Sequence, residues 1–173
     1  MKSALFILFF LFYIVYNAQT SIKKISIAFD AKITSVEEVG AKINIVKILI
    51  VRDNILIDSL ITQNGRCLIN LDTGYSYKIY FTKTGYVSKH LLVVTKDLPE
   101  TYPLKSKIKV DVSLFKSKPN LDLSFLNTKP IGVATYNFVS KKIQWDAEYT
   151  RLMIDKIIQA TVEHYDKTKN NDE

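Results

Sequence analysis

Cysteine and histidine, on which disulfides, zinc sites and many catalytic centres depend, are nearly absent from this sequence. Its 173 residues include one cysteine and two histidines. A lone cysteine cannot form an internal disulfide, so the fold must be held by its apolar core. His90 and His164 are far apart, and neither has a metal-ligand residue three or four positions away, which excludes a zinc motif. We interpret His90 as a surface residue of a strand and His164 as a residue on the polar face of a helix.

Motifs of familiar catalytic sites are missing as well. The sequence has no Gly-x-Ser-x-Gly elbow, no glycine-rich phosphate loop and no Asp-x-Asp-x-Asp-Gly calcium loop. Glu37 and Glu38 are neighbours on a predicted loop, where adjacent carboxylates are usually solvated charges. Cys67 alternates with Ile69 and Leu71, which predicts a buried thiol rather than a nucleophile. We therefore expect that the chain is not an enzyme and has no catalytic residue, no metal and no cofactor.

The first 20 residues have the pattern of an export signal. Met1-Lys2-Ser3 precede a continuous apolar run from Ala4 to Tyr16, after which the chain turns polar. This run is short for a membrane-spanning helix, which needs roughly 20 apolar residues. We expect a signal peptide over residues 1–20 and a protein exported to the periplasm or the outer membrane, with an uncleaved anchor as the alternative. Because the only cysteine is Cys67, the chain is not expected to be a lipoprotein, and no transmembrane segment is expected after the signal.

The chain is basic, with a formal net charge of +7 at pH 7. Its lysines are spread without a dense run, so a solvated surface explains them most simply. In an exported protein, the excess favours an anionic envelope surface or an acidic partner protein, and we expect no binding to nucleic acid.

Seven segments alternate apolar and polar residues with the period of a β-strand. They cover residues 25–33, 42–51, 55–62, 66–71, 77–82, 88–95 and 108–115. Asn64-Gly65, between the third and fourth segments, predicts a β-hairpin with both turn residues at positive φ. Residues 116–145 form an irregular extension that ends in two short strands, 133–138 and 142–145.

Residues 146–165 contain neither glycine nor proline and repeat apolar residues at helical spacing. Asp146 is suited to cap this helix. Its apolar stripe, which either packs on the strands or docks on a partner, consists of Ile154, Ile157, Ile158 and Val162. Residues 166–173 are polar and are predicted to form a disordered tail. The predicted fold is mainly β, a single β-sandwich of about seven antiparallel strands of the transthyretin or immunoglobulin type, with a C-terminal α-helix.

A recognisable pattern lies between Gly65 and Lys89. After Gly65, it reads Y-x-I-x-F-x-K-x-G-Y-x-x-K from Tyr77 onward. This pattern resembles the signature of carboxypeptidase regulatory-like domains, which are transthyretin-like β-sandwiches of exported Bacteroidetes proteins, and the whole chain resembles small secreted proteins of that group. The resemblance implies such a domain over residues 21–115. Gln63 and Cys67 depart from the signature, which has an aspartate and an aromatic residue at those places.

Gly85 and Tyr86 interrupt the strand pattern at a predicted corner. We expect Gly85 to adopt a positive φ, and the ring of Tyr86 to cover the end of the sandwich with its hydroxyl bonded to the main chain. Gly65 and Tyr77 complete this structural motif.

Two surfaces are candidates for binding. One is the outward face around Lys78 and Tyr80, with Tyr75 and Tyr102 nearby, where aromatic rings beside lysines suit sugar or protein ligands. The other is the C-terminal helix with Ile154 and Ile158. The leading hypothesis is a non-catalytic accessory or binding protein of the cell envelope that acts through protein–protein contacts, in the periplasm or at an outer-membrane complex. The alternative is a carbohydrate-binding module of a polysaccharide-uptake system.

Overall fold

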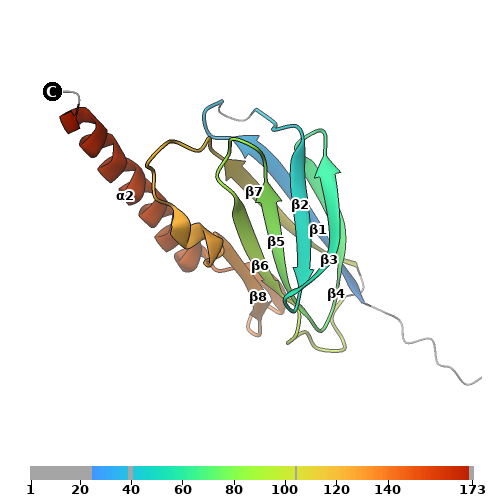
Figure 1. Ribbon diagram of the computed structural model, residues 1–173. Helices are drawn as coiled ribbons and strands as arrows, with labels where there is room; N and C mark the ends of the chain where they lie inside the picture. Colours follow the sequence, from blue (N-terminus) through green and yellow to red (C-terminus); the bar gives the residue numbers. More distant parts are fainter. Residues whose placement is uncertain (1–24, 39–40, 104, 172–173) are drawn as a thin grey trace, which may run out of the picture.

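The computed structural model describes residues 25–38, 41–103 and 105–171, and over these residues the chain forms a β-sandwich followed by a long helix (Figure 1). The predicted signal peptide lies outside the described residues. The strands are β1 (Ser26–Ser35), β2 (Val46–Arg52), β3 (Ile55–Thr62), β4 (Arg66–Asp72), β5 (Ser76–Thr82), β6 (Lys89–Val94), β7 (Lys105–Leu114), β8 (Gly132–Asn137) and β9 (Lys142–Trp145), and the helices are η1 (Ser124–Asn127) and α2 (Ala147–Asn171).

The two sheets have the orders β4-β1-β7 and β3-β2-β5-β6-β8-β9. This confirms the predicted β-sandwich with a C-terminal helix. The expectation that all strands are antiparallel is wrong at two places, because β1 pairs with β7 and β6 pairs with β8 in parallel. The chain crosses from β6 in the large sheet to β7 in the small one, and β7 enters beside the start of β1, where Ser26 is paired with Lys105.

The core lies between the sheets and follows the alternation of the strands. In β5, Tyr77, Ile79 and Phe81 are at most 1% exposed, whereas Lys78 and Tyr80 on the opposite face are half-buried. Phe29 of β1 meets them from the small sheet and is fully buried. Each such large apolar side chain contributes about 1.5–3 kcal/mol on burial.

The predicted Asn64-Gly65 hairpin is wrong. β3 pairs with β2 and β4 pairs with β1, so this turn carries the chain from one sheet to the other. Of its two residues only Gly65 has a positive φ, of 64°. The hairpin with two positive-φ residues is Asp53-Asn54, at 47° and 68°, between β2 and β3. Similarly, β2 begins at Val46 and not at residue 42, because Ile45 has a φ of 56° and breaks the extended backbone.

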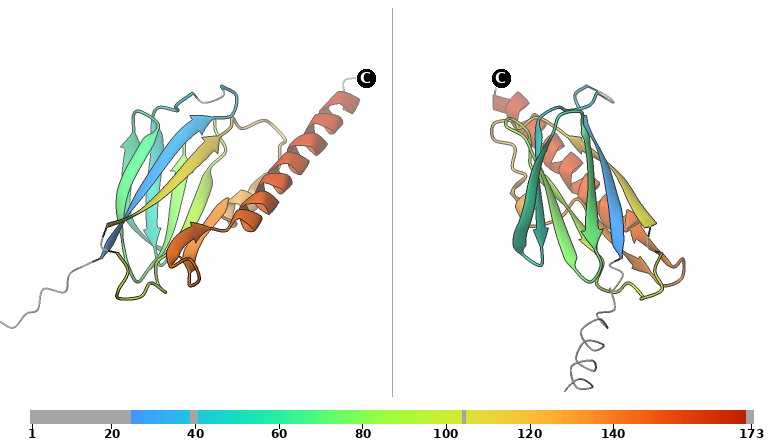
Figure 2. Two further views of the ribbon diagram at one scale, coloured as in Figure 1. Left: turned by 180° about the vertical axis from the view of Figure 1, so that it is seen from behind. Right: turned by 90° about the vertical axis from the view of Figure 1, so that its right-hand side faces the viewer.

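A second, smaller core joins the extension to the helix. Leu123 and Leu126, around η1, are buried against Met153 of α2. Asp146 caps the helix as predicted, since its Oδ1 accepts the amide of Tyr149 at 2.9 Å. The helix does not end at residue 165 but continues to Asn171, so the predicted disordered tail is helical over most of its length. The helix runs along one side of the sandwich, and its C-terminal half projects beyond it (Figure 2).

Candidate functional site

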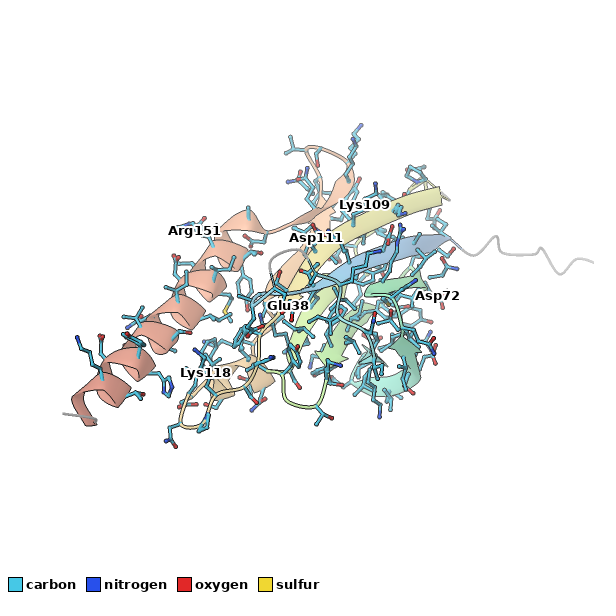
Figure 3. The ribbon with its side chains drawn as sticks, turned by 90° about the horizontal axis from the view of Figure 1, so that it is seen from above. Glu38, Asp72, Lys109, Asp111, Lys118 and Arg151 are labelled. Atoms are coloured by element: carbon cyan, nitrogen blue, oxygen red, sulfur yellow. The ribbon has the colours of Figure 1, made fainter. Side chains whose placement is uncertain are left out.

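A groove separates the middle of α2 from the end of the small sheet, and we call it the α2 groove. It has a volume of about 560 Å³. Its residues come from α2, from the turn after β1, and from the start of β6 and the end of β7 with the extension. They are Ile154, Ile157, Ile158, Thr161 and Val162; Val36 and Glu37; and Lys89, Ser113, Phe115, Lys116, Lys118 and Leu121. Lys118 is labelled on the extension beside the helix in Figure 3.

The helix turns a different face to the body from the one expected. Met153 and Ile157 face inward, because they lie against the buried leucines around η1. The predicted stripe residues Ile154, Ile158 and Val162 are 50%, 55% and 53% exposed. They form one wall of the α2 groove. The prediction that the stripe packs on the strands is therefore wrong for these three residues, and the alternative that it faces a partner remains.

Lys89 is a buried cation at the bottom of the α2 groove. It is 7% exposed. Its Nζ donates to the main-chain oxygen of Ser113 at 2.6 Å and lies 4.2 Å from the centre of the Phe115 ring. Burial lowers the pKa of Lys89 to about 8, against the opposing charge of Glu37. The sequence analysis did not identify Lys89 as a groove residue. Its position in the alternating pattern of β6, two residues before the inward Leu91 and four before Val93, could have predicted its burial.

Glu37 is fixed at the rim of the groove. One carboxylate oxygen accepts the amide of Lys116 at 2.7 Å, and the other accepts the hydroxyl of Ser35 at 3.0 Å. Although desolvation would raise the pKa of Glu37, these hydrogen bonds lower it. Glu37 is therefore a structural anion that ties the turn after β1 to the extension, and not the freely solvated charge that was expected.

The free edge of β7 is capped by side chains from the large sheet. Lys89 of β6 donates to the main-chain oxygen of Ser113, and the indole of Trp145 in β9 donates to that of Lys109 at 2.9 Å. Edge strands expose unpaired main-chain groups that invite pairing with another strand. These two contacts satisfy two edge carbonyls of β7, and the one at Ser113 lies at the α2 groove.

Lys78 and Tyr80 share the outer face of β5, but the predicted aromatic surface is not formed, because its rings are covered or buried. Tyr80 is half-buried, and its ring stacks on the ring of His90 with the ring centres 4.7 Å apart. The guanidinium of Arg52 lies over the Tyr75 ring, 4.4 Å from its centre. Lys78 donates to the side chain of Asn54 at 2.9 Å. Tyr102 is 8% exposed, and its hydroxyl accepts the amide of Ile143, so it offers no face for stacking.

The interpretation of His90 as a surface residue is wrong. It is 2% exposed because η1 and the extension cover the outer face of β6 at this point. Burial lowers the pKa of His90, opposed by its hydrogen bond with the main chain of Leu126. The predicted burial of Cys67 is confirmed at 1% exposure, and desolvation raises the pKa of its thiol to about 11.

The residues of the structural motif have partly different roles from those predicted. Gly85 has the expected positive φ, of 78°, at the corner before β6. The ring of Tyr86 is partly buried against the main core. The hydroxyl that bonds to the main chain belongs to Tyr77, which contacts Asp72. Gly65 packs so closely that a Cβ there would lie 2.7 Å from the main-chain oxygen of Ile33.

Within the described part of the chain, no group of three or more histidine, cysteine, aspartate or glutamate side chains is arranged to hold a metal ion. No helix among the described residues is long and apolar enough to cross a membrane.

Comparisons with known proteins give only distant likenesses. No family model matches the chain, and no curated protein matches it. Catechol 1,2-dioxygenase of Acinetobacter radioresistens is 13% identical, with a TM-score of 0.43 over 60% of this chain and 56% of that one. The TIE protein of Bacillus anthracis is 16% identical, with a TM-score of 0.42 over 69% and 24%. The major pilin SpaD of Corynebacterium diphtheriae is 9% identical, with a TM-score of 0.39 over 54% and 31%. The chain thus spans little more than half of the dioxygenase, and these alignments assign it neither a family nor an activity.

The prediction that the chain is not an enzyme requires correction. Catechol dioxygenases, which are enzymes, are among the similar solved structures. The prediction is withdrawn, because the motifs that the sequence lacks describe only a few kinds of catalytic site.

Proposed function

We propose that this protein is an accessory or binding protein of the cell envelope that acts through protein–protein contacts, in the periplasm or at an outer-membrane complex. The observation that carries the proposal is the apolar wall of the α2 groove, where Ile154, Ile158 and Val162 are each about half exposed. Contiguous exposed apolar surface of this kind marks interaction sites. The predicted signal peptide supports the compartment.

We infer that the occupant of the α2 groove is an apolar helical segment of a partner protein. Ile154, Ile158 and Val162 recur every four residues and so form a ridge about 12 Å long on one side of α2. An amphipathic helix packs its own apolar side chains against such a ridge when it binds in a groove.

Edge strand β3 is the rival surface. Ile55, Leu56, Ile57 and Ile61 are 68%, 58%, 42% and 62% exposed. These side chains are divided between the two faces of the strand, since Leu56 and Ile55 are neighbours, and the exposed Asp58 lies among them. They therefore form a less continuous apolar surface than the ridge of α2.

We also propose that residues 21–115 form a carboxypeptidase regulatory-like domain of the transthyretin type, as in exported Bacteroidetes proteins. Its support is the placement of the signature residues. Tyr77, Ile79 and Phe81 are buried together, and Gly65 and Gly85 have φ values of 64° and 78°. A carbohydrate-binding role is not proposed, because Tyr102 is buried and Tyr80 is covered by His90 on one face.

A photo-crosslinking amino acid at position 158 tests the proposed function in intact cells of the native host. Controls carry it at Gln159, on another face of α2, or at Ile61 of β3. We expect one envelope polypeptide to crosslink from position 158 and not from the controls. That polypeptide, once purified, should bind the wild-type protein and the Gln159→Asp variant equally, and the Ile158→Asp variant at least tenfold more weakly.

Ile158→Asp should fold normally because the side chain is 55% exposed, and its melting temperature checks this. Crosslinking from position 61 alone would move the contact to β3. Undiminished binding by a folded Ile158→Asp variant would remove the α2 groove from the proposed function.

A further inference from the structure

The α2 groove holds a buried ammonium, that of Lys89, whose hydrogen-bond donors are only partly used by the described residues. An ammonium group has three hydrogen-bond donors. The Nζ of Lys89 gives one hydrogen bond, to Ser113, and faces the ring of Phe115. Among the described residues, no carboxylate lies within ion-pair distance of Lys89. Burying an ammonium without a carboxylate is costly, and a methionine would fill a similar space without that cost.

The charges around Lys89 are unbalanced toward the positive. Lys116 and Lys118 also line the α2 groove, and Glu37 is its one acidic residue within the described chain. Both oxygens of Glu37 already accept hydrogen bonds, from Ser35 and from the amide of Lys116. The groove therefore offers a low-dielectric site for one further negative charge, where an ion pair is stronger than in water.

The walls determine what kind of anion fits. Ile154, Ile158 and Val162 line one side, and Phe115 and Leu121 line the other. A small hydrated anion would leave these apolar side chains in contact with water. An anionic group attached to an apolar segment satisfies the ammonium and covers the walls together.

Resting on the proposed function, we propose that the partner's helical segment carries an aspartate or glutamate on its apolar face, and that its carboxylate pairs with the ammonium of Lys89. The carboxylate supplies the charge that the groove lacks, and the flanking apolar residues pack on the ridge of α2. Lys89 thereby selects among apolar segments, because a segment without the acid leaves the ammonium unpaired when it excludes water from the groove.

Two amphipathic peptides test the inference. Each has about 14 residues, or four helical turns, with capped ends and leucines on one face, and the peptides differ only in a central glutamate or glutamine among the leucines. Fluorescence anisotropy measures their binding to wild-type protein and to the Lys89→Met, Lys118→Met and Ile158→Asp variants. Dodecanoate is added as a competitor to represent a fatty-acid carboxylate.

We expect the glutamate peptide to bind the wild-type protein about tenfold more tightly than the glutamine peptide, which corresponds to about 1.4 kcal/mol. Lys89→Met should abolish this preference, and Lys118→Met should preserve it. Ile158→Asp should weaken both peptides.

Equal binding of the two peptides to the wild-type protein, weakened by Ile158→Asp, would overturn the inference and leave the proposed function standing. Failure of both peptides to bind, or binding unaffected by Ile158→Asp, would count against the proposed function itself. Displacement of the glutamate peptide by micromolar dodecanoate would overturn the inference in favour of a lipid carboxylate.

Discussion

The hydroxyl of Tyr77 and the main chain of Asp72 exchange two hydrogen bonds. The hydroxyl donates to the main-chain oxygen of Asp72 at 3.2 Å and accepts from its amide at 3.0 Å. Tyr77 belongs to the large sheet and Asp72 ends β4 of the small one, so this pair ties the two layers at one end of the sandwich. The ring is 1% exposed, and burial raises the pKa of Tyr77, which keeps the hydroxyl protonated as a donor.

Replacing Tyr77 with phenylalanine should lower the free energy of unfolding by about 1–3 kcal/mol, because both hydrogen bonds are lost while the ring remains buried. Urea denaturation measures the change. Tyr165→Phe removes a hydroxyl from a side chain that is 69% exposed and should have little effect. Equal stabilities of the two variants would contradict the role given to Tyr77.

Gly65→Ala should destabilise the protein more than Gly85→Ala. Both glycines have a positive φ, of 64° and 78°, at which a side chain costs about 1–2 kcal/mol. Only at Gly65 would the added Cβ also approach a main-chain oxygen, that of Ile33, at 2.7 Å. Thermal melting of the two variants decides the order, and a smaller loss for Gly65→Ala would contradict the close packing. Gly85→Val should also lower the melting temperature, through strain.

Asp30 should stabilise the fold at neutral pH and lose this effect in acid. It is 7% exposed and accepts two hydrogen bonds from Arg66, at 2.9 and 2.8 Å, and is paired with Lys107. These contacts hold the pKa of Asp30 well below its ordinary value of 3.8. Because the folded-state pKa is the lower one, the stabilisation is present above pH 3.8 and is lost as the pH falls below it.

The corresponding measurement is the melting temperature of Asp30→Asn against wild type between neutral pH and strong acid. The variant should be less stable at neutral pH, and the difference should shrink in acid. Asp97→Asn, in an exposed turn, serves as the control. A difference that is independent of pH would show that the charge of Asp30 is not its source.

The buried ammonium of Lys89 makes stability depend on pH in the same direction as Asp30 does, but in alkali rather than in acid. Burial lowers the pKa of Lys89 from 10.5 to about 8. Between these values the unfolded chain binds more protons than the native state, so this lysine's contribution to stability becomes more favourable as pH rises. The stability of Lys89→Met relative to wild type should therefore fall by up to about 3 kcal/mol from pH 8 to 10.5.

Urea denaturation of Lys89→Met and wild type across this range measures the difference in their stability. The titration of Cys67 does not contribute to this difference, because both proteins contain it. Parallel stability curves would mean that Lys89 titrates near its ordinary pKa.

The strands and the buried thiol were predictable because the signal is local. Residues that alternate with period two, such as Tyr77, Ile79 and Phe81, have to share one face of a strand wherever the strand lies. Cys67 follows from the same rule. Asp146 could be identified as a cap because its partner, the amide of Tyr149, is three residues away.

The features that the sequence did not reveal depend on distant parts of the chain. Asn64-Gly65 has the composition of a hairpin turn. However, the two strands that it joins pair with other strands, β3 with β2 and β4 with β1. His90 looks like a surface residue until η1, more than 30 residues later, covers it. The face of α2 that packs inward is determined by contacts with the leucines of the extension. The isoleucine stripe alone therefore could not show which face of the helix packs on the body.

The order of the small sheet also determines when the molecule can fold. β1 is the first strand of the described chain, yet it lies in the middle of its sheet, and its partner β7 ends only at Leu114. The pairing of Ser26 with Lys105 spans most of the sandwich. Closing loops of this length slows folding, because the entropy of closure is lost before the contacts form. As the chain is made from its N-terminus, β1 therefore lacks this neighbour until the seventh strand has appeared, and the small sheet cannot be completed before then.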